Sequence, residues 1–287
     1  MRFRIGIVVV SLAVALIASS AHASAFLQLK STSVSPGLNP HVYADLNANG
    51  GWEENRHIST GVYNANIQFL RYPGAEPYPA EEIAFWNSID DQDTTPNNVA
   101  LNTAYNVGGF CIDLGQYWTT AYREYNVSAL SAAPLNKYVP NGMGTPKANQ
   151  IYELFGRYLP TLQDKLANGT DPEKNGYAAV MQACVWEIVS ESATTLSLTS
   201  NYVQVLELPG YYQNLAATWL SSINGDANYR YKGTIVALVN KDNQDFALYV
   251  DGLPGSAVPE PLTMASAFLA IGGLGAYIRR RTGRAVA

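Results

Sequence analysis

The chain is short of charge, and basic residues are the scarcer kind. Only 14% of its 287 residues are charged. The two terminal segments hold six of the 18 basic residues but one of the 23 acidic residues: Arg2, Arg4, Arg279, Arg280, Arg281 and Arg284 against Glu260. The central part therefore has 12 basic and 22 acidic residues, a net charge of −10. Such a surface repels phosphate backbones, so nucleic acid is not expected as a partner.

Histidine and cysteine are also rare. Outside the N-terminal segment the chain has His41, His57, Cys111 and Cys184. Gln182–Cys184 reads QAC, as in the caspase signature, but the following residues end the match and no histidine lies about fifty residues upstream. The sequence does not single out a pair of carboxylates for a polysaccharide hydrolase either. We therefore expect no enzyme, no cofactor and no metal site.

The N-terminal segment, residues 1–23, has the pattern of a secretory signal peptide. Basic Arg2 and Arg4 precede an apolar run at 5–18, and Ala21 and Ala23 form an A-x-A cleavage site. A membrane anchor would need a longer run without such a site. The mature chain is expected to begin near Ser24.

The C-terminal segment, residues 258–287, reads VPEP, then an apolar run, then arginines. The uncharged run at 262–278 has the marginal length of a transmembrane helix, which the basic tail at 279–287 would stop on the cytoplasmic side. The arrangement resembles the PEP-CTERM sorting signal of Gram-negative bacteria, whose tails are processed by exosortases. The motif residues would be Pro259, Glu260, Pro261, Arg279, Arg280 and Arg281. The resemblance implies an inner-membrane intermediate, then a place at the cell surface or in an exopolysaccharide-containing matrix, with signal peptidase and exosortase as processing partners.

Residues 24–257 are expected to form one α+β domain. Sequence patterns predict strands at 25–33 and 60–72, one or two at 106–127, and a hairpin at 229–251 with its turn at 240–243. Helices are predicted at 147–158, ended by Pro160, and at 177–190 and 210–223. Strands on both sides of a helical insert indicate a mixed or antiparallel sheet or a barrel-like lobe. Residues 35–55 are predicted to be loop; DLNANG at 45–50 begins like a calcium loop, but Arg56 replaces its terminal glutamate.

The helix predicted at 177–190 carries a glutamine in apolar surroundings. With about 100° per residue, Gln182 lies amid an apolar stripe: Ala178, Ala179, Val185, Trp186 and Val189. Burying its amide costs about 1–3 kcal/mol unless the amide is paired. Cys184 lies about 200° away around the helix, on a mixed face with Tyr177, Glu187 and Glu191. We therefore expect Gln182, and not Cys184, to face the strand that carries Cys111.

Two readings of these residues stay open. In an exported protein, two cysteines favour a disulfide, here Cys111–Cys184, worth about 2–4 kcal/mol. Gln182 is then a hydrogen-bonded core residue, and the protein is a structural component of the envelope or exopolysaccharide matrix.

The second reading rests on a resemblance. FCIDL at 110–114 and MQACVW at 181–186 resemble the two motifs of bacterial thioester domains, which occur in surface adhesins. There, a strand cysteine attacks a helix glutamine, ammonia leaves, and the internal thioester captures amines covalently. The resemblance implies that Cys111 supplies the sulfur and Gln182 the acyl group, with Asp113 and Trp186 as supporting residues. Cys184 departs from the pattern, which has an aliphatic residue there. The implied function is covalent adhesion to an amine-bearing surface target.

Overall fold

The computed structural model describes residues 27–45, 54–69, 104–134, 141–191, 195–200 and 202–250. The signal-peptide segment, the sorting segment and residues 46–50 of the DLNANG stretch lie outside these ranges, so the expectations for them stay predictions. Among the helices of the described ranges, none combines the length and apolar character needed to cross a bilayer.

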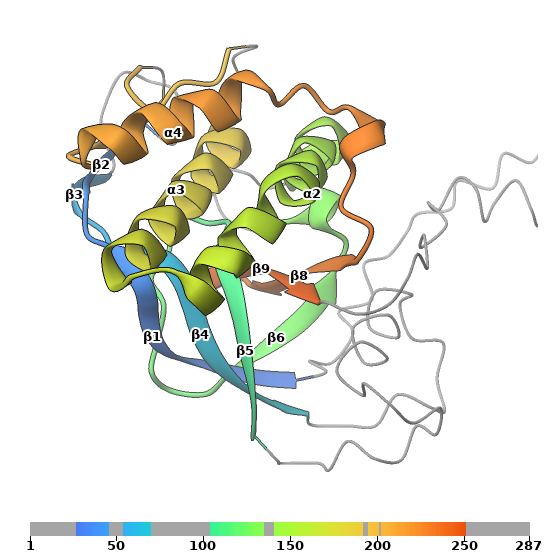
Figure 1. The fold of residues 1–287 in the computed structure, drawn as a ribbon. Coiled ribbons are helices and arrows are strands. Elements are labelled where there is room, and N and C mark those ends of the chain that lie inside the picture. Colours follow the sequence, from blue (N-terminus) through green and yellow to red (C-terminus); the bar gives the residue numbers. More distant parts are fainter. Residues whose placement is uncertain are drawn as a thin grey trace, which may run out of the picture.

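Antiparallel strands form a closed six-stranded barrel (Figure 1). In order around the barrel they are β1 (Leu27–Leu38), β4 (Thr60–Phe69), β5 (Ala104–Cys111), β9 (Asn243–Val250), β8 (Thr234–Asn240) and β6 (Arg123–Ser128), which pairs back onto β1. Alternation along the strands turns one set of side chains inward. Leu29 and Ile67 are fully buried there. The rings of Tyr63 and Tyr125 lie 5.5 and 6.3 Å from the ring of Phe246, so aromatic side chains fill the barrel.

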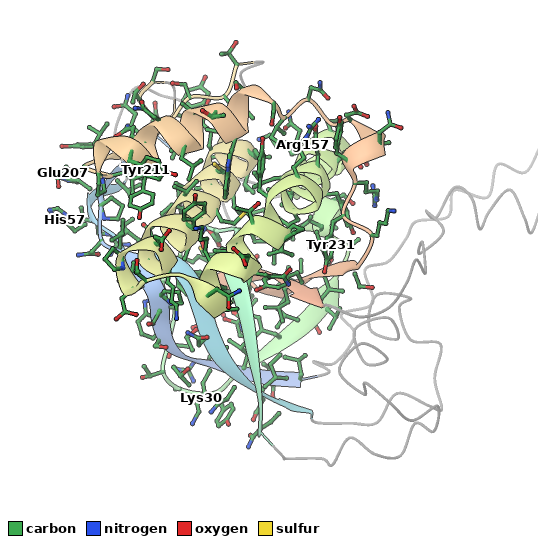
Figure 2. All side chains as sticks on the ribbon, in the orientation of Figure 1. Lys30, His57, Arg157, Glu207, Tyr211 and Tyr231 are labelled. Atoms are coloured by element: carbon green, nitrogen blue, oxygen red, sulfur yellow. The ribbon has the colours of Figure 1, made fainter. Side chains whose placement is uncertain are left out.

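A second sheet and three helices complete the described fold. The sheet has the order β3-β2-β7, formed by β2 (His41–Ala44), β3 (Glu54–His57) and β7 (Val203–Leu206). The helices are α2 (Gly144–Asn168), α3 (Asp171–Ser190) and α4 (Gly210–Ser221). Figure 1 shows α3 between α2 and α4 above the barrel, where it contacts β1 and β4. Side chains fill the space between these layers (Figure 2). The fold is α+β with antiparallel sheets and a helical insert, as predicted.

Helix α3 begins at a capping box and is then buried on every side. The backbone N–H of Thr170 donates to Glu173 Oε2 at 3.0 Å, which pairs a donor at the helix start. Every residue from Gly176 to Val189 is buried. The face around Cys184, which carries polar and apolar residues in the sequence, is therefore buried and not exposed. Glu187 and Glu191 can be buried because their carboxyl groups accept hydrogen bonds from the backbone N–H groups of Ser197 and Val203.

The prediction that a helix ends before Pro160 is also wrong. Helix α2 runs through this residue to Asn168. An interior proline costs about 3 kcal/mol because it removes a backbone hydrogen bond and crowds the preceding turn. Leu154 and Phe155 before it and Leu159 and Leu162 around it are fully buried. Burying each such side chain contributes about 1.5–3 kcal/mol, which offsets the local cost of the proline.

The segment 35–55, predicted to be loop, contains strands. β1 continues to Leu38 and stays paired with β4 as far as Thr60. The two backbones approach so closely that a Cβ at Gly61 would lie 2.3 Å from the carbonyl oxygen of Pro36, which explains a glycine in this strand. β2 then forms because Val42 and Ala44 are fully buried on one face of the second sheet.

Candidate functional site

Cys111 is the last residue of β5. At this residue β5 is still paired with β9 but no longer with β4. The pairing of β5 with β4 ends at Gly109, opposite Tyr63. The pairing with β9 continues to Cys111, opposite Phe246. Gly109 belongs to this close pairing, because a Cβ there would lie 2.8 Å from the carbonyl oxygen of Ala247. Cys111 shares the inward side of the barrel with Phe246. Within the described ranges, its backbone has no strand partner on the β4 side.

Gln182 takes the place of the missing strand. The backbone N–H of Cys111 donates to Gln182 Oε1 at 2.8 Å, and Gln182 Nε2 donates to the carbonyl oxygen of Cys111 at 2.8 Å. The amide thus forms the pair of bonds that a neighbouring peptide group would form. Both residues are fully buried. This pairing removes the desolvation cost of a polar group amid apolar residues. Gln182, and not Cys184, faces Cys111, as helical periodicity predicts.

The sulfur of Cys111 forms hydrogen bonds with several polar groups. Gln244 Nε2 donates to Sγ at 2.7 Å, and the thiol donates to the carbonyl oxygen of Asp113 at 3.0 Å. The backbone N–H of Asp113 donates back to the sulfur at 3.3 Å. The Trp186 indole is fully buried, and its N–H has no hydrogen-bond acceptor of ordinary geometry among the described residues. It still lies close enough to the thiol to affect its ionisation.

Burial raises the pKa of the Cys111 thiol far above its ordinary value. The indole N–H of Trp186 opposes this rise, while the carboxylates of Asp113 and Asp245 add to it because they repel a thiolate. At neutral pH the group is therefore a neutral thiol. A reaction of Cys111 must move the thiol proton during the step, since a preformed thiolate is not held here.

Cys184 points to another part of the molecule. Its sulfur lies 3.9 Å from the carbonyl oxygen of Ala216 in α4, and burial raises the pKa of this thiol as well. Cys111 and Cys184 are both free thiols in the structure. The disulfide of the structural reading would require α3 to turn, because residues two apart on a helix project in nearly opposite directions.

All four residues singled out from the sequence thus meet at one site: Cys111, Gln182, Asp113 and Trp186. Four residues near the sulfur were not predicted from the sequence: Gln244, Asp245, Tyr63 and Tyr125. Tyr125 Oη donates to the carbonyl oxygen of Gln244 at 3.0 Å, which connects β6 to β9 beside the thiol. The signal was present in NQDFALY, where Gln244 and Asp245 interrupt an apolar hairpin strand yet are 4% and 0% exposed.

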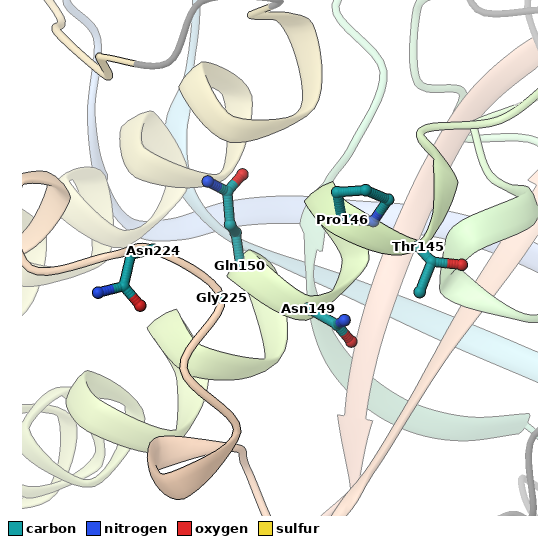
Figure 3. A pocket seen from close by; sticks show the side chains of 6 residues that line it. All are labelled: Thr145, Pro146, Asn149, Gln150, Asn224 and Gly225. Atoms are coloured by element: carbon teal, nitrogen blue, oxygen red, sulfur yellow. The ribbon is translucent and has the colours of Figure 1, made fainter.

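A surface groove elsewhere provides no part of this site (Figure 3). It has a volume of about 300 Å³ and lies between the start of α2 and the segment after α4. Its lining residues are Thr145, Pro146, Asn149, Gln150, Asn224 and Gly225. Glu153 fixes the segment after α4 that forms one wall of the groove. Its Oε2 accepts hydrogen bonds from the backbone N–H groups of residues 224, 225 and 226 at 2.9, 2.6 and 3.0 Å. None of these residues contacts Cys111 or Gln182 through a described hydrogen bond.

No protein-family model matches the chain, and comparisons with curated proteins and with solved structures return no match.

Proposed function

We propose that this protein is exported and that Cys111 and Gln182 form an internal thioester for covalent attachment to an amine-bearing target at the cell surface or in the matrix. The observation that carries the proposal is the pair of 2.8 Å hydrogen bonds between the Gln182 amide and the Cys111 backbone. They hold the acyl group beside the residue that bears the sulfur. The sequence resemblance of the two motifs to thioester domains supports the same pairing.

The chemistry balances within these two residues. Cys111 Sγ bonds to the Gln182 side-chain carbonyl carbon, the C–N bond breaks, and the thiol proton leaves with the amide nitrogen as ammonia. Negative charge develops on Oε1 during the attack, where the Cys111 N–H already donates at 2.8 Å. A donor directed at a developing oxyanion lowers the barrier to acyl transfer. The N–H of Gln244 at the sulfur favours charge there during the same step.

Burial would preserve the bond once it has formed. Both residues are fully buried, and exclusion of water slows the hydrolysis of an acyl donor. The target amine takes the acyl group from Cys111, which returns to the thiol form. Each molecule reacts once, so the proposed protein is a covalent binder and not an enzyme. Because both residues are fully buried, small amines are expected to react fastest.

The intact mass of the purified exported protein tests the thioester. We expect the measured mass to be lower by one ammonia than the mass calculated from the mature sequence. After denaturation, one thiol should react with an alkylating reagent. Methylamine should add its own mass and expose a second thiol. Cys111→Ala should abolish both effects, whereas the matched control Cys184→Ala should retain them. A mass equal to the calculated one, together with two free thiols, would overturn the proposal. A mass lower by two hydrogens, which dithiothreitol restores to the calculated value, would establish the disulfide instead.

A purely structural function has one observation in its favour. The Gln182 amide is fully paired in the structure without any covalent bond. In that case Gln182 completes the sheet edge, and the protein is a non-reactive component of the envelope or exopolysaccharide matrix. The same mass measurement separates the two functions, because only the thioester removes ammonia.

Export is tested separately by the ends of the mature chain. Peptide mapping of the protein from its host should find an N-terminus near Ser24 and no peptide beyond about 258–261. Recovery of Arg279–Arg281 from the extracellular form would contradict processing of the sorting segment.

A further inference from the structure

The only two histidines of the chain outside the signal-peptide segment meet on the second sheet. His41 and His57 are opposite each other in the pairing of β2 with β3, and their ring centroids are 4.8 Å apart. Opposite residues of antiparallel strands project to the same face. On β2, Val42 and Ala44 are buried on the other face, so the histidines occupy the outer one.

A carboxylate from a third chain segment joins them. β7 lies on the other side of β2, with Leu206 opposite His41, and Glu207 follows directly. Glu207 Oε2 lies 3.9 Å from His57 Nδ1. Figure 2 shows His57 and Glu207 side by side at one edge of the molecule. Glu207 has a φ of 67°, a left-handed conformation that is uncommon for glutamate. One ligand atom from each of the three residues lies within 4.8 Å of the others.

We propose that His41, His57 and Glu207 bind a divalent transition metal, with Zn²⁺ as the fitting ion. Two imidazoles and one carboxylate are a ligand set that zinc uses when a fourth position stays open to water or another ligand. Zinc bonds of about 2.0–2.2 Å require the donor atoms to move closer together. His57 and Glu207 are exposed and His41 is half-buried, so side-chain rotation can supply this movement.

The surroundings also fit a metal-binding histidine. His57 Nδ1 lies 3.0 Å from the carbonyl oxygen of Asn39. A metal bound through Nε2 would keep this contact, and donation from Nδ1 to the backbone carbonyl would then fix the tautomer. A metal bound through Nδ1, the nitrogen that lies nearer to Glu207, would replace the contact. The net charge of −10 in the central part of the chain favours cation binding. The bound ion would join β2 and β3 to the end of β7, which is distant from them in sequence. This site does not depend on the thioester.

Calorimetric titration of ZnCl₂ into the mature exported protein, first treated with a chelator, tests the site. We expect one Zn²⁺ per chain, a rise in Tm on binding, and no comparable binding of Ca²⁺, because nitrogen ligands favour transition metals. His57→Ala and Glu207→Gln should each weaken binding by about tenfold or more, since even residues behind the ligands have effects of this size. The matched control is Asp242→Asn, which removes an exposed carboxylate in the β8–β9 turn. It should leave the affinity unchanged.

Circular dichroism of each variant separates loss of ligand from loss of fold. Two results would overturn the proposal: no saturable zinc binding by the wild-type protein, or binding that both His57→Ala and Glu207→Gln leave intact while they remain folded.

Discussion

Replacing Gln182 by methionine removes both hydrogen bonds to Cys111 while keeping a side chain of similar length. The N–H and C=O groups of Cys111 would remain buried without these partners, because among the described residues no strand pairs with Cys111 on that side of β5. Each buried unpaired group costs about 1–3 kcal/mol. We therefore expect Gln182→Met to lower the free energy of unfolding by about 2–6 kcal/mol. Equilibrium unfolding in urea, with an unchanged m-value, measures this loss.

Cys111→Ala is the informative partner of this variant. It leaves the backbone groups of Cys111 in place, so the bonds to Gln182 survive. If no thioester forms, the substitution removes the thiol and its hydrogen bonds with Gln244 and Asp113. Both backbone groups of Cys111 stay paired, so the loss should be below that of Gln182→Met. If the thioester forms, a cross-link between residues 71 positions apart is lost as well. Such a cross-link lowers the entropy of the unfolded chain, which stabilises the folded state by about 4 kcal/mol. Cys111→Ala should then cost about 4 kcal/mol more than the loss of the thiol alone, and Gln182→Met should cost more than Cys111→Ala because it also leaves the Cys111 backbone groups unpaired.

The double variant completes the test. Without a covalent bond the two losses should add, because the hydrogen bonds go to the backbone and not to the sulfur. With a thioester they should fall short of additivity, since either substitution alone abolishes the same bond. A Gln182→Met variant within about 0.5 kcal/mol of wild type would refute the pairing itself, because that is the usual range of surface substitutions.

Three further outcomes follow from other buried contacts. Glu153→Ala should cost about 3–5 kcal/mol in urea unfolding, because Arg157 and three backbone N–H groups lose a buried carboxylate; retention of wild-type stability would contradict this network. Burial raises the pKa of Glu187 from 4.5 to about 9, so the folded state holds a proton that the unfolded chain releases. The free energy of unfolding should therefore fall as pH rises from about 4.5 to about 9, and Glu187→Gln should flatten that profile. Gly156→Ala should lower Tm strongly because its Cβ would meet the Tyr229 carbonyl oxygen, whereas Gly210→Ala, with no atom within 4 Å, should not.

Local patterns were sufficient for the elements whose signals come from consecutive residues. The end of helix α3 and the β8–β9 hairpin lie where periodicity and turn residues predict them, whereas α3 begins at Asp171 and not at the predicted residue 177. The orientation of Gln182 also followed from the angle between helix positions, because that angle depends on the backbone alone. The pairing of Gln182 with the Cys111 backbone did not follow, since it depends on where β4 leaves β5. Such an end of pairing is set by the three-dimensional course of two distant strands.

Tertiary contacts decided the remaining elements. Pro160 signals a helix end only when the following turn has nothing to bury, and here Leu162 is fully buried. Glu187 and Glu191 indicated an exposed face, but backbone N–H groups from 197 and 203 enclose them. Carboxylates can be buried when they accept hydrogen bonds, and those donors lie beyond the helix that a periodicity argument considers.

The contact that stabilises Gln182 is also the contact that would prepare it for reaction. An unpaired amide in the core would be costly, so the fold supplies Cys111 N–H to Oε1 and Cys111 C=O to Nε2. The first of these bonds strengthens if Oε1 gains negative charge, whereas the second is lost when nitrogen leaves as ammonia. A thioester therefore exchanges one hydrogen bond for one covalent bond and keeps the other. Gln182→Glu separates these roles, because its protonated acid can reproduce both hydrogen bonds while its ionised form places a second acceptor against the Cys111 carbonyl. We expect this variant to lose more stability than wild type between acidic and neutral pH, and to lose no ammonia. The same pH dependence in the variant and in wild type would show that Nε2 does not need to be a donor at this position.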